Sequence, residues 1–211
     1  MPAYAPDVAL VVVDVQNDFA DPAGGLYVEG GERVVDAANA EIGAARAAGA
    51  FVVYTQDSHP PETPHFAAQG GVWPVHCVAG TWGAELHPRL RIEGPVMPKG
   101  VDGSDGYSGF SVRDPVSGER EATNLGSQLE RRGVKRLVVV GLAGDVCVKE
   151  TALDGRRLGY EVEVPLKTTA MVGSAAAGEQ ALAEMREAGV DVTGTAVDLS
   201  ARPVTGTTLA S

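Results

Sequence analysis

The chain has 211 residues, of which 44% are hydrophobic and 21% charged. At this length one domain can bury a sizeable core, so we expect a single domain over residues 1–211. Its 28 acidic against 17 basic side chains give a net charge of -11, which argues against nucleic acid or an anionic membrane as a partner, because both bind positively charged surfaces. The amino terminus lacks the basic and apolar regions of a signal peptide, and no apolar run approaches membrane-spanning length, so we expect a cytoplasmic protein.

Apolar runs alternate with helical patterns along the whole chain, which is typical of repeated strand-helix units. In chain order the pattern predicts a strand at 9–13, a helix at 32–48, strands at 51–55 and 95–98, a helix at 125–132, a strand at 137–140, a helix at 146–158, a strand at 161–166, a helix at 175–188 and a strand at 190–192. Strands this uniformly apolar belong to parallel sheets that are covered on both faces. We therefore expect an α/β fold of three layers, with a mostly parallel, Rossmann-like sheet of about six strands and helices on both faces. Residues 198–211 are expected to form a loosely ordered tail.

The segment 56–94 interrupts this alternation and contains all four histidines and both tryptophans of the chain. Long irregular loops in compact domains are uncommon unless they are functional or disordered. The aromatic and histidine content favours a functional loop.

A candidate metal site lies in this loop. Asp57 and His59 are two residues apart at a predicted strand end, so their side chains point the same way. His76 or His65 could complete a histidine and carboxylate site for one divalent metal ion, zinc, iron(II) or manganese. The alternative is that these are unrelated histidines of a surface loop.

Two other residues of the loop are interpreted as structural. Cys77 follows His76 directly, and adjacent side chains of an extended chain face opposite ways, so Cys77 is predicted to be a buried thiol. His87 has no short-range partner. The chain's two cysteines, Cys77 and Cys147, cannot form a disulfide framework, and we expect both to be free thiols.

A candidate nucleophile lies where the most apolar strand turns into a helix. Cys147 falls near the amino terminus of the helix predicted at 146–158, where the helix dipole favours an anion and free backbone N–H groups could hold an oxyanion. The alternative is a packed core cysteine, which is what most free cysteines are.

Two charged residues also lie at predicted strand ends. Asp14 follows the first apolar strand, and its burial there is costly unless a partner neutralises it. Lys99, after the strand at 95–98, is the natural partner. Because reactive groups gather at the carboxyl ends of parallel strands, Asp14, Lys99 and Cys147 together outline a catalytic triad.

With these residues in these positions, the chain resembles a known family, the isochorismatase-like cysteine hydrolases, and within it the nicotinamidases. The resemblance runs from about Leu10 to Val192. The segments that carry it are Val-Asp-Val-Gln-Asn-Asp-Phe at 13–19, Asp-Ser-His at 57–59, Trp-Pro-Val-His-Cys-Val at 73–78, Lys-Gly at 99–100, Tyr-Ser-Gly-Phe at 107–110 and Asp-Val-Cys-Val-Lys-Glu-Thr-Ala at 145–152.

The resemblance implies a role for each matched residue. It implies that Asp14, Lys99 and Cys147 form the catalytic triad. It implies that the metal ligands are Asp57, His59 and His76, with His65 a ligand in some members only. The aromatic walls of the substrate pocket are implied to be Phe19, Trp73 and Tyr107. It also implies a cis peptide before Ala143, so that the backbone N–H groups of Ala143 and Cys147 form an oxyanion hole. The chain departs from the family pattern at two places. It has Ser58 where an aromatic residue is common in nicotinamidases, and the loop between Lys99 and Tyr107 belongs to a region whose length varies in the family.

The resemblance implies hydrolysis of nicotinamide to nicotinate and ammonia through a thioester, with a small carboxamide as substrate and a homo-oligomeric assembly. The Asp-x-His motif favours a pyridine carboxamide, because a metal would bind the ring nitrogen. Two alternatives stay open: another small amide or N-carbamoyl substrate for the same chemistry, and a non-catalytic binding module.

Overall fold

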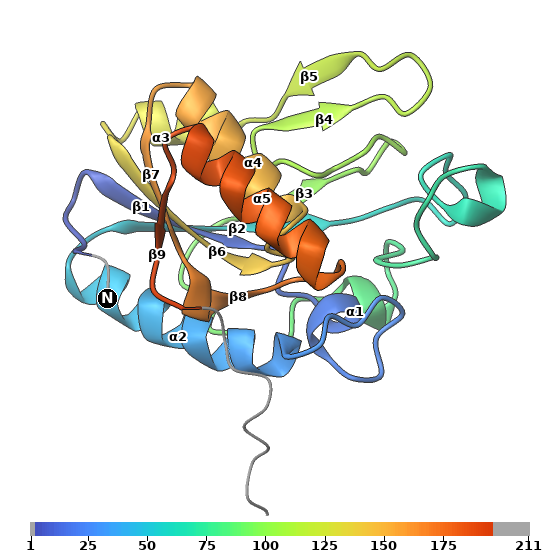
Figure 1. The fold of residues 1–211 in the computed structure, drawn as a ribbon, viewed down its shortest axis with the longest axis horizontal. Coiled ribbons are helices and arrows are strands. Elements are labelled where there is room, and N and C mark those ends of the chain that lie inside the picture. Colours follow the sequence, from blue (N-terminus) through green and yellow to red (C-terminus); the bar gives the residue numbers. More distant parts are fainter. Residues whose placement is uncertain (1–2, 196–211) are drawn as a thin grey trace, which may run out of the picture.

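The computed structural model describes residues 3–195, and its centre is a seven-stranded sheet in which every strand pair is parallel (Figure 1). The strand order is β3-β2-β1-β6-β7-β9, and β8 pairs with β6. The strands are β1 (Val8–Val13), β2 (Phe51–Asp57), β3 (Val96–Lys99), β6 (Arg136–Leu142), β7 (Glu161–Pro165), β8 (Thr169–Ala170) and β9 (Asp191–Thr193). No helix among residues 3–195 is long and apolar enough to cross a membrane.

Helices cover both faces of this sheet, as Figure 1 shows. They are α1 (Asn17–Ala20), α2 (Gly31–Ala47), α3 (Leu125–Glu130), α4 (Cys147–Arg157) and α5 (Ala175–Glu187). Side chains of α2 pack with Leu10 and Val12 of β1 on one face. Side chains of α3, α4 and α5 pack with Ala9, Val11 and Val13 on the other. Every residue of β1 is therefore buried, and the predicted three-layer α/β fold is confirmed.

Each strand and helix predicted from the apolar pattern is present, with ends displaced by at most two residues. The structure adds β8, the short helix α1 and an antiparallel hairpin of β4 (Ser111–Arg113) and β5 (Arg120–Ala122). The hairpin was missed because its strands are polar and largely exposed, so they form no apolar run. The tail predicted at 198–211 lies outside the described residues.

The sheet order brings the candidate residues to one edge. The neighbouring strands β3, β2, β1 and β6 all end there, and Lys99 and Asp57 are paired in register at the ends of β3 and β2. Asp14 follows β1, and Cys147 follows β6 as the first residue of α4. The segment between β2 and β3 is irregular, as predicted, apart from two short 3-10 helices, η1 (Ala67–Gln69) and η2 (Trp82–Ala84).

Candidate active site

Asp14 is fully buried directly after β1, where its backbone turns out of the sheet with a φ of 48°. Both carboxylate oxygens have a neighbour. The Thr55 hydroxyl donates to Oδ1 at 2.6 Å, and Lys99 Nζ lies 2.7 Å from Oδ2. Burial raises the pKa of the Asp14 carboxyl, while Lys99 acts in the opposite direction. Asp14 is therefore a carboxylate whose affinity for a proton is increased by its surroundings.

Lys99 joins three groups of the site. Its Nζ lies 2.7 Å from Asp14 Oδ2 and 3.4 Å from Asp57 Oδ1, and 4.0 Å from Cys147 Sγ. It also donates to the backbone carbonyl of Gly106. Burial alone would lower the pKa of this buried amine, but Asp14 and then Asp57 outweigh it, and the Lys99 pKa is raised well above its ordinary value. Lys99 therefore stays charged, and the expected pairing with Asp14 is present.

Cys147 is the first residue of α4 and is 8% exposed. Burial raises the pKa of its thiol well above the ordinary value, with Lys99 opposing this rise and the charge of Asp14 adding to it. The position at a helix amino terminus favours a thiolate, but burial prevails here. The resting side chain is a thiol, so the site needs a base, and the Asp14 carboxylate, whose charge adds to the rise in the thiol pKa, is the candidate.

Three buried imidazoles form a cluster beside this triad. The candidate ligand nitrogens of His59, His65 and His76 all lie within 4.8 Å of one another. Asp57 Oδ2 lies 3.0 Å from His59 Nε2 and 3.5 Å from His76 Nε2. Nitrogen and oxygen donors gathered in this way suit a borderline divalent ion such as zinc. The residues therefore fit a divalent metal, and the structure brings all four predicted ligands together.

Neighbouring groups hold the imidazoles in orientation. His76 Nδ1 lies 2.7 Å from the carbonyl of Pro74, which leaves Nε2 facing Asp57. His65 Nδ1 lies 2.7 Å from Asp105 Oδ1. Burial lowers the pKa of His65, which favours the neutral imidazole that a metal ion requires. Metal-binding histidines usually have such a partner on the other ring nitrogen.

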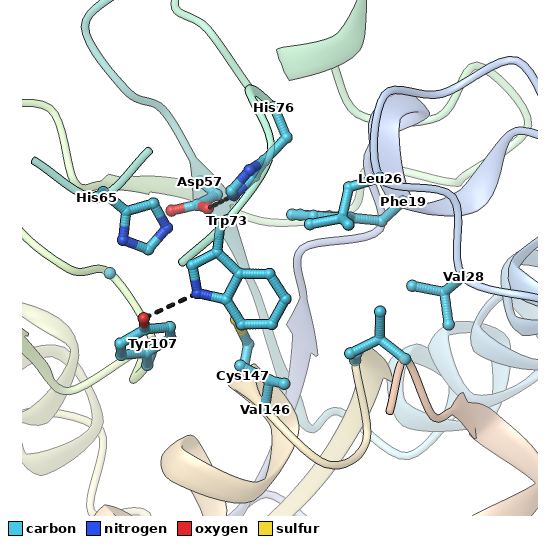
Figure 2. Close-up of a pocket in the computed structure, with 13 residues that line it drawn as sticks. Phe19, Leu26, Val28, Asp57, His65, Trp73, His76, Tyr107, Val146 and Cys147 are labelled. Atoms are coloured by element: carbon cyan, nitrogen blue, oxygen red, sulfur yellow. Dashed lines mark hydrogen bonds and ion pairs between the residues drawn. The ribbon is translucent and has the colours of Figure 1, made fainter. Parts of the chain in front are cut away.

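A cavity with about 400 Å³ of space, its open mouth included, joins the cluster to the thiol. The predicted aromatic residues Phe19, Trp73 and Tyr107 all line it, and Trp73 Nε1 donates to the Tyr107 hydroxyl at 2.9 Å (Figure 2). Four apolar lining residues were not predicted, namely Leu26, Val28, Val146 and Val172. Figure 2 shows His65, Asp57 and His76 at one side of the cavity and Phe19, Leu26 and Val28 at another. The mainly apolar and aromatic lining, with a few polar groups at one side, is that of a small-molecule site.

The turn from β6 to α4 carries the expected backbone features. The Leu142–Ala143 peptide bond is cis, and Ala143 lines the cavity beside Cys147. As the first residue of α4, Cys147 has a backbone N–H without an intrahelical acceptor.

Two residues that contribute to the site were not predicted from the sequence. Thr55 lies inside an apolar strand, and Asp105 lies in a Gly-rich loop 40 positions from His65. Cys77 is buried as predicted, and burial raises its pKa well above the ordinary value. His87 is buried outside the histidine cluster, where its Nδ1 accepts from the N–H of Arg89.

The chain is similar in sequence and in fold to several known proteins. The family model described as the isochorismatase domain matches residues 8–197. The nicotinamidase/pyrazinamidase of Mycobacterium tuberculosis is 40% identical over 189 residues, which are 87% of this chain and 97% of that protein. Among solved structures, the pyrazinamidase of Pyrococcus horikoshii in complex with zinc has a TM-score of 0.80 and 34% identity, and covers 90% of this chain and 100% of its own. A protein of L. infantum in complex with nicotinate has a TM-score of 0.83 and 36% identity, with 91% and 95% covered.

Proposed function

This chain belongs to the isochorismatase-domain family, and from that premise we propose that it hydrolyses nicotinamide to nicotinate and ammonia as a metal-dependent cysteine amidohydrolase. The observation that carries the proposal is one cavity that holds a buried thiol beside a carboxylate-lysine pair and, next to them, a cluster of three imidazoles and a carboxylate. The first set suits attack on an amide. The second suits a ring that bears a basic nitrogen.

The attack follows from the charges around Cys147. Asp14 takes the thiol proton, and the sulfur attacks the carboxamide carbon while Lys99 stays as the counter-charge of the new ion pair. The raised pKa of Asp14 suits this transfer, because a base works best when its pKa lies near the working pH. The N–H groups of Ala143 and Cys147 are proposed to hold the tetrahedral oxyanion, each contributing about 3 kcal/mol.

The second half of the reaction uses the same carboxyl. Protonated Asp14 gives its proton to the departing ammonia, which leaves a thioester on Cys147. The regenerated carboxylate then deprotonates a water that cleaves the thioester and releases the acid. Phe19, Trp73 and Tyr107 are proposed to pack against the flat ring.

Asp57, His59, His65 and His76 are the proposed holders of one divalent metal ion, with zinc, iron(II) and manganese as candidates. When bound, the ion supplies a Lewis acid that accepts the ring-nitrogen lone pair. Activation of the Cys147 thiol is assigned to Asp14 and Lys99 alone.

Purified, metal-loaded protein is expected to release nicotinate and ammonia from nicotinamide in equal amounts. The measurement is chromatographic nicotinate and enzymatic ammonia from one time course. An N-carbamoyl amino acid, assayed in parallel, represents the alternative substrate class and is expected to release far less ammonia. Absence of nicotinamide turnover in metal-loaded protein would overturn the proposed function.

Thr55 is expected to affect the rate through Asp14. Thr55→Val keeps the shape of the side chain but removes the 2.6 Å hydrogen bond to Oδ1. A hydrogen bond to a charged group contributes about 1.5–3 kcal/mol, so kcat for nicotinamide is expected to fall about 10- to 100-fold with little change in KM. Thr55→Ser, which restores a hydroxyl, should recover most of the rate. Equal kcat in the Val variant and the wild type would show that this bond does not orient the base.

A further inference from the structure

The side chain of Gln16 is fully buried where the sequence motif at 13–19 leaves β1, and the mechanism above gives it no role. Its oxygen accepts from the backbone N–H of Asp57 at 2.7 Å. Its Nε2 lies 2.7 Å from the backbone carbonyl of Asp57, 2.9 Å from that of Ala84 and 3.3 Å from Cys77 Sγ. The amide thus uses its acceptor and both donor hydrogens inside the protein.

The two bonds to Asp57 replace a missing strand partner. Pairing of β1 with β2 ends at Val12 and Tyr54, because the chain turns at Asp14, whose backbone lies in the left-handed region. Beyond that point the β1 side of Asp57 has no backbone partner in the sheet. The Gln16 amide offers one donor and one acceptor there, in the manner of another strand residue.

Asp57 contacts both the histidine cluster and the triad. Its Oδ2 lies 3.0 Å from His59 Nε2 and 3.5 Å from His76 Nε2, while its Oδ1 lies 3.4 Å from Lys99 Nζ. The position of its backbone therefore sets both the distance to two imidazoles of the cluster and the contact with the triad.

The same motif segment also holds the other side of the cluster. Gln16 contacts the sulfur of Cys77, the residue after His76. Asp18 Oδ2 accepts from the backbone N–H of Cys77 at 2.6 Å, where the chain again has a positive φ of 46°. Gln16 joins the end of β2 to the segment that carries His76, since it contacts Asp57 and Cys77 at once.

We propose that Gln16 is a positioning residue that sets the metal affinity of the histidine cluster by clamping the backbone of Asp57. The inference rests on the metal site of the proposed function. Loss of such a supporting partner typically weakens metal binding about 10- to 100-fold. We expect Gln16→Leu to weaken zinc binding by that factor, with a loss of nicotinamide turnover that saturating zinc partly restores.

The chain provides a matched control. Gln56 also donates its Nε2 to the carbonyl of Ala84, at 2.8 Å, and it lies next to Asp57 in sequence. It makes no hydrogen bond to the Asp57 backbone among those of the described residues. Gln56→Leu is therefore expected to change zinc affinity by less than about threefold, although it removes a glutamine bond to the same acceptor.

The experiment measures zinc affinity by competition with a chromophoric chelator for the wild type, Gln16→Leu and Gln56→Leu, with circular dichroism to verify folding. Gln16→Asn is the second variant, since it keeps an amide that is too short to span both bonds, and it decides the question if Gln16→Leu does not fold. Weaker binding in a folded Gln16 variant, with Gln56→Leu unchanged, supports the inference. Wild-type affinity in a folded Gln16 variant overturns it, as does equal weakening in both positions. If the wild type itself binds no zinc, the proposed metal site fails first, so the two failures are distinguishable.

Discussion

Cys147→Ala is expected to reduce nicotinate release from nicotinamide by at least about 10⁴-fold, because removing the nucleophile of a covalent mechanism removes nearly all of the chemical acceleration. The thiol lines the cavity, with its sulfur 4.0 Å from Lys99 Nζ. Alanine is a good helix former, so the substitution at this first position of α4 is expected to preserve the fold. Steady-state kinetics on protein verified as folded by circular dichroism provides the measurement.

Cys77→Ala is the matched control for this loss. Cys77 is also a buried free thiol whose pKa is raised by burial, but it does not line the cavity. Its removal is expected to leave kcat within about tenfold of the wild type, because it takes no part in the bond changes. Substantial turnover by Cys147→Ala would show that another group attacks the amide and would end the account of a cysteine nucleophile.

Lys99→Met is expected to destabilise the fold by about 3–5 kcal/mol at neutral pH, the usual effect of removing one partner from a buried charge network. The substitution leaves Asp14 and Asp57 buried without the cation that lies 2.7 Å and 3.4 Å from them. Urea unfolding in the presence of a chelator measures the effect on the free energy of unfolding, since a bound metal ion would itself neutralise Asp57. Catalysis should fail as well.

The loss of stability should depend on pH with a definite sign. Burial raises the pKa of Asp14 and Lys99 opposes this rise; without Lys99, that pKa lies still further above its unfolded value of about 3.9. The folded variant then binds more protons than the unfolded chain just above that value, so its stability rises as pH falls through this window. In the wild type the lowered pKa of Asp57 acts in the opposite direction, because its contribution to stability is lost as pH drops below about 4. The difference between the two proteins should therefore shrink towards acid pH.

Arg46→Met is the control for the lysine. Arg46 pairs with Glu93 at 3.5 Å on the surface, where their side chains are 56% and 45% exposed. Exposed ion pairs contribute about 0–1 kcal/mol, so this variant should unfold almost like the wild type. Equal destabilisation by the two substitutions would contradict the view that burial is what makes Lys99 important.

The parts of the fold that were predicted from the sequence share one property, a long apolar or amphipathic pattern. β1 is an unbroken apolar run and α2 has apolar residues at helical spacing, so the local pattern specifies both. The hairpin β4 and β5 has no such pattern, because its polar residues face solvent and pairing alone defines it. β8 has only two residues, which is too short for any periodicity to be seen.

The residues of the site also fall into those that a local sequence pattern predicts and those that it does not. Asp14, Lys99 and Cys147 follow predicted strands, so the rule that parallel strands end at one edge was enough to bring them together. Thr55 and Asp105 act through single hydrogen bonds to residues about 40 positions away, and no local pattern identifies such pairs. Gln16 belongs to a motif that the family resemblance includes, but its bonds to Asp57 depend on where the chain turns out of the sheet.

The central claim is that Cys147 attacks a carboxamide whose ring nitrogen is held at the histidine cluster. The most direct test compares kcat/KM for nicotinamide and for benzamide, which lacks the ring nitrogen, in metal-loaded and in metal-free protein. The account predicts that nicotinamide is preferred about 100-fold or more in the loaded protein, because a site built around a polar group strongly rejects an analogue without it, and that the preference falls towards one when the metal is removed. The same ratio with and without metal would contradict the account.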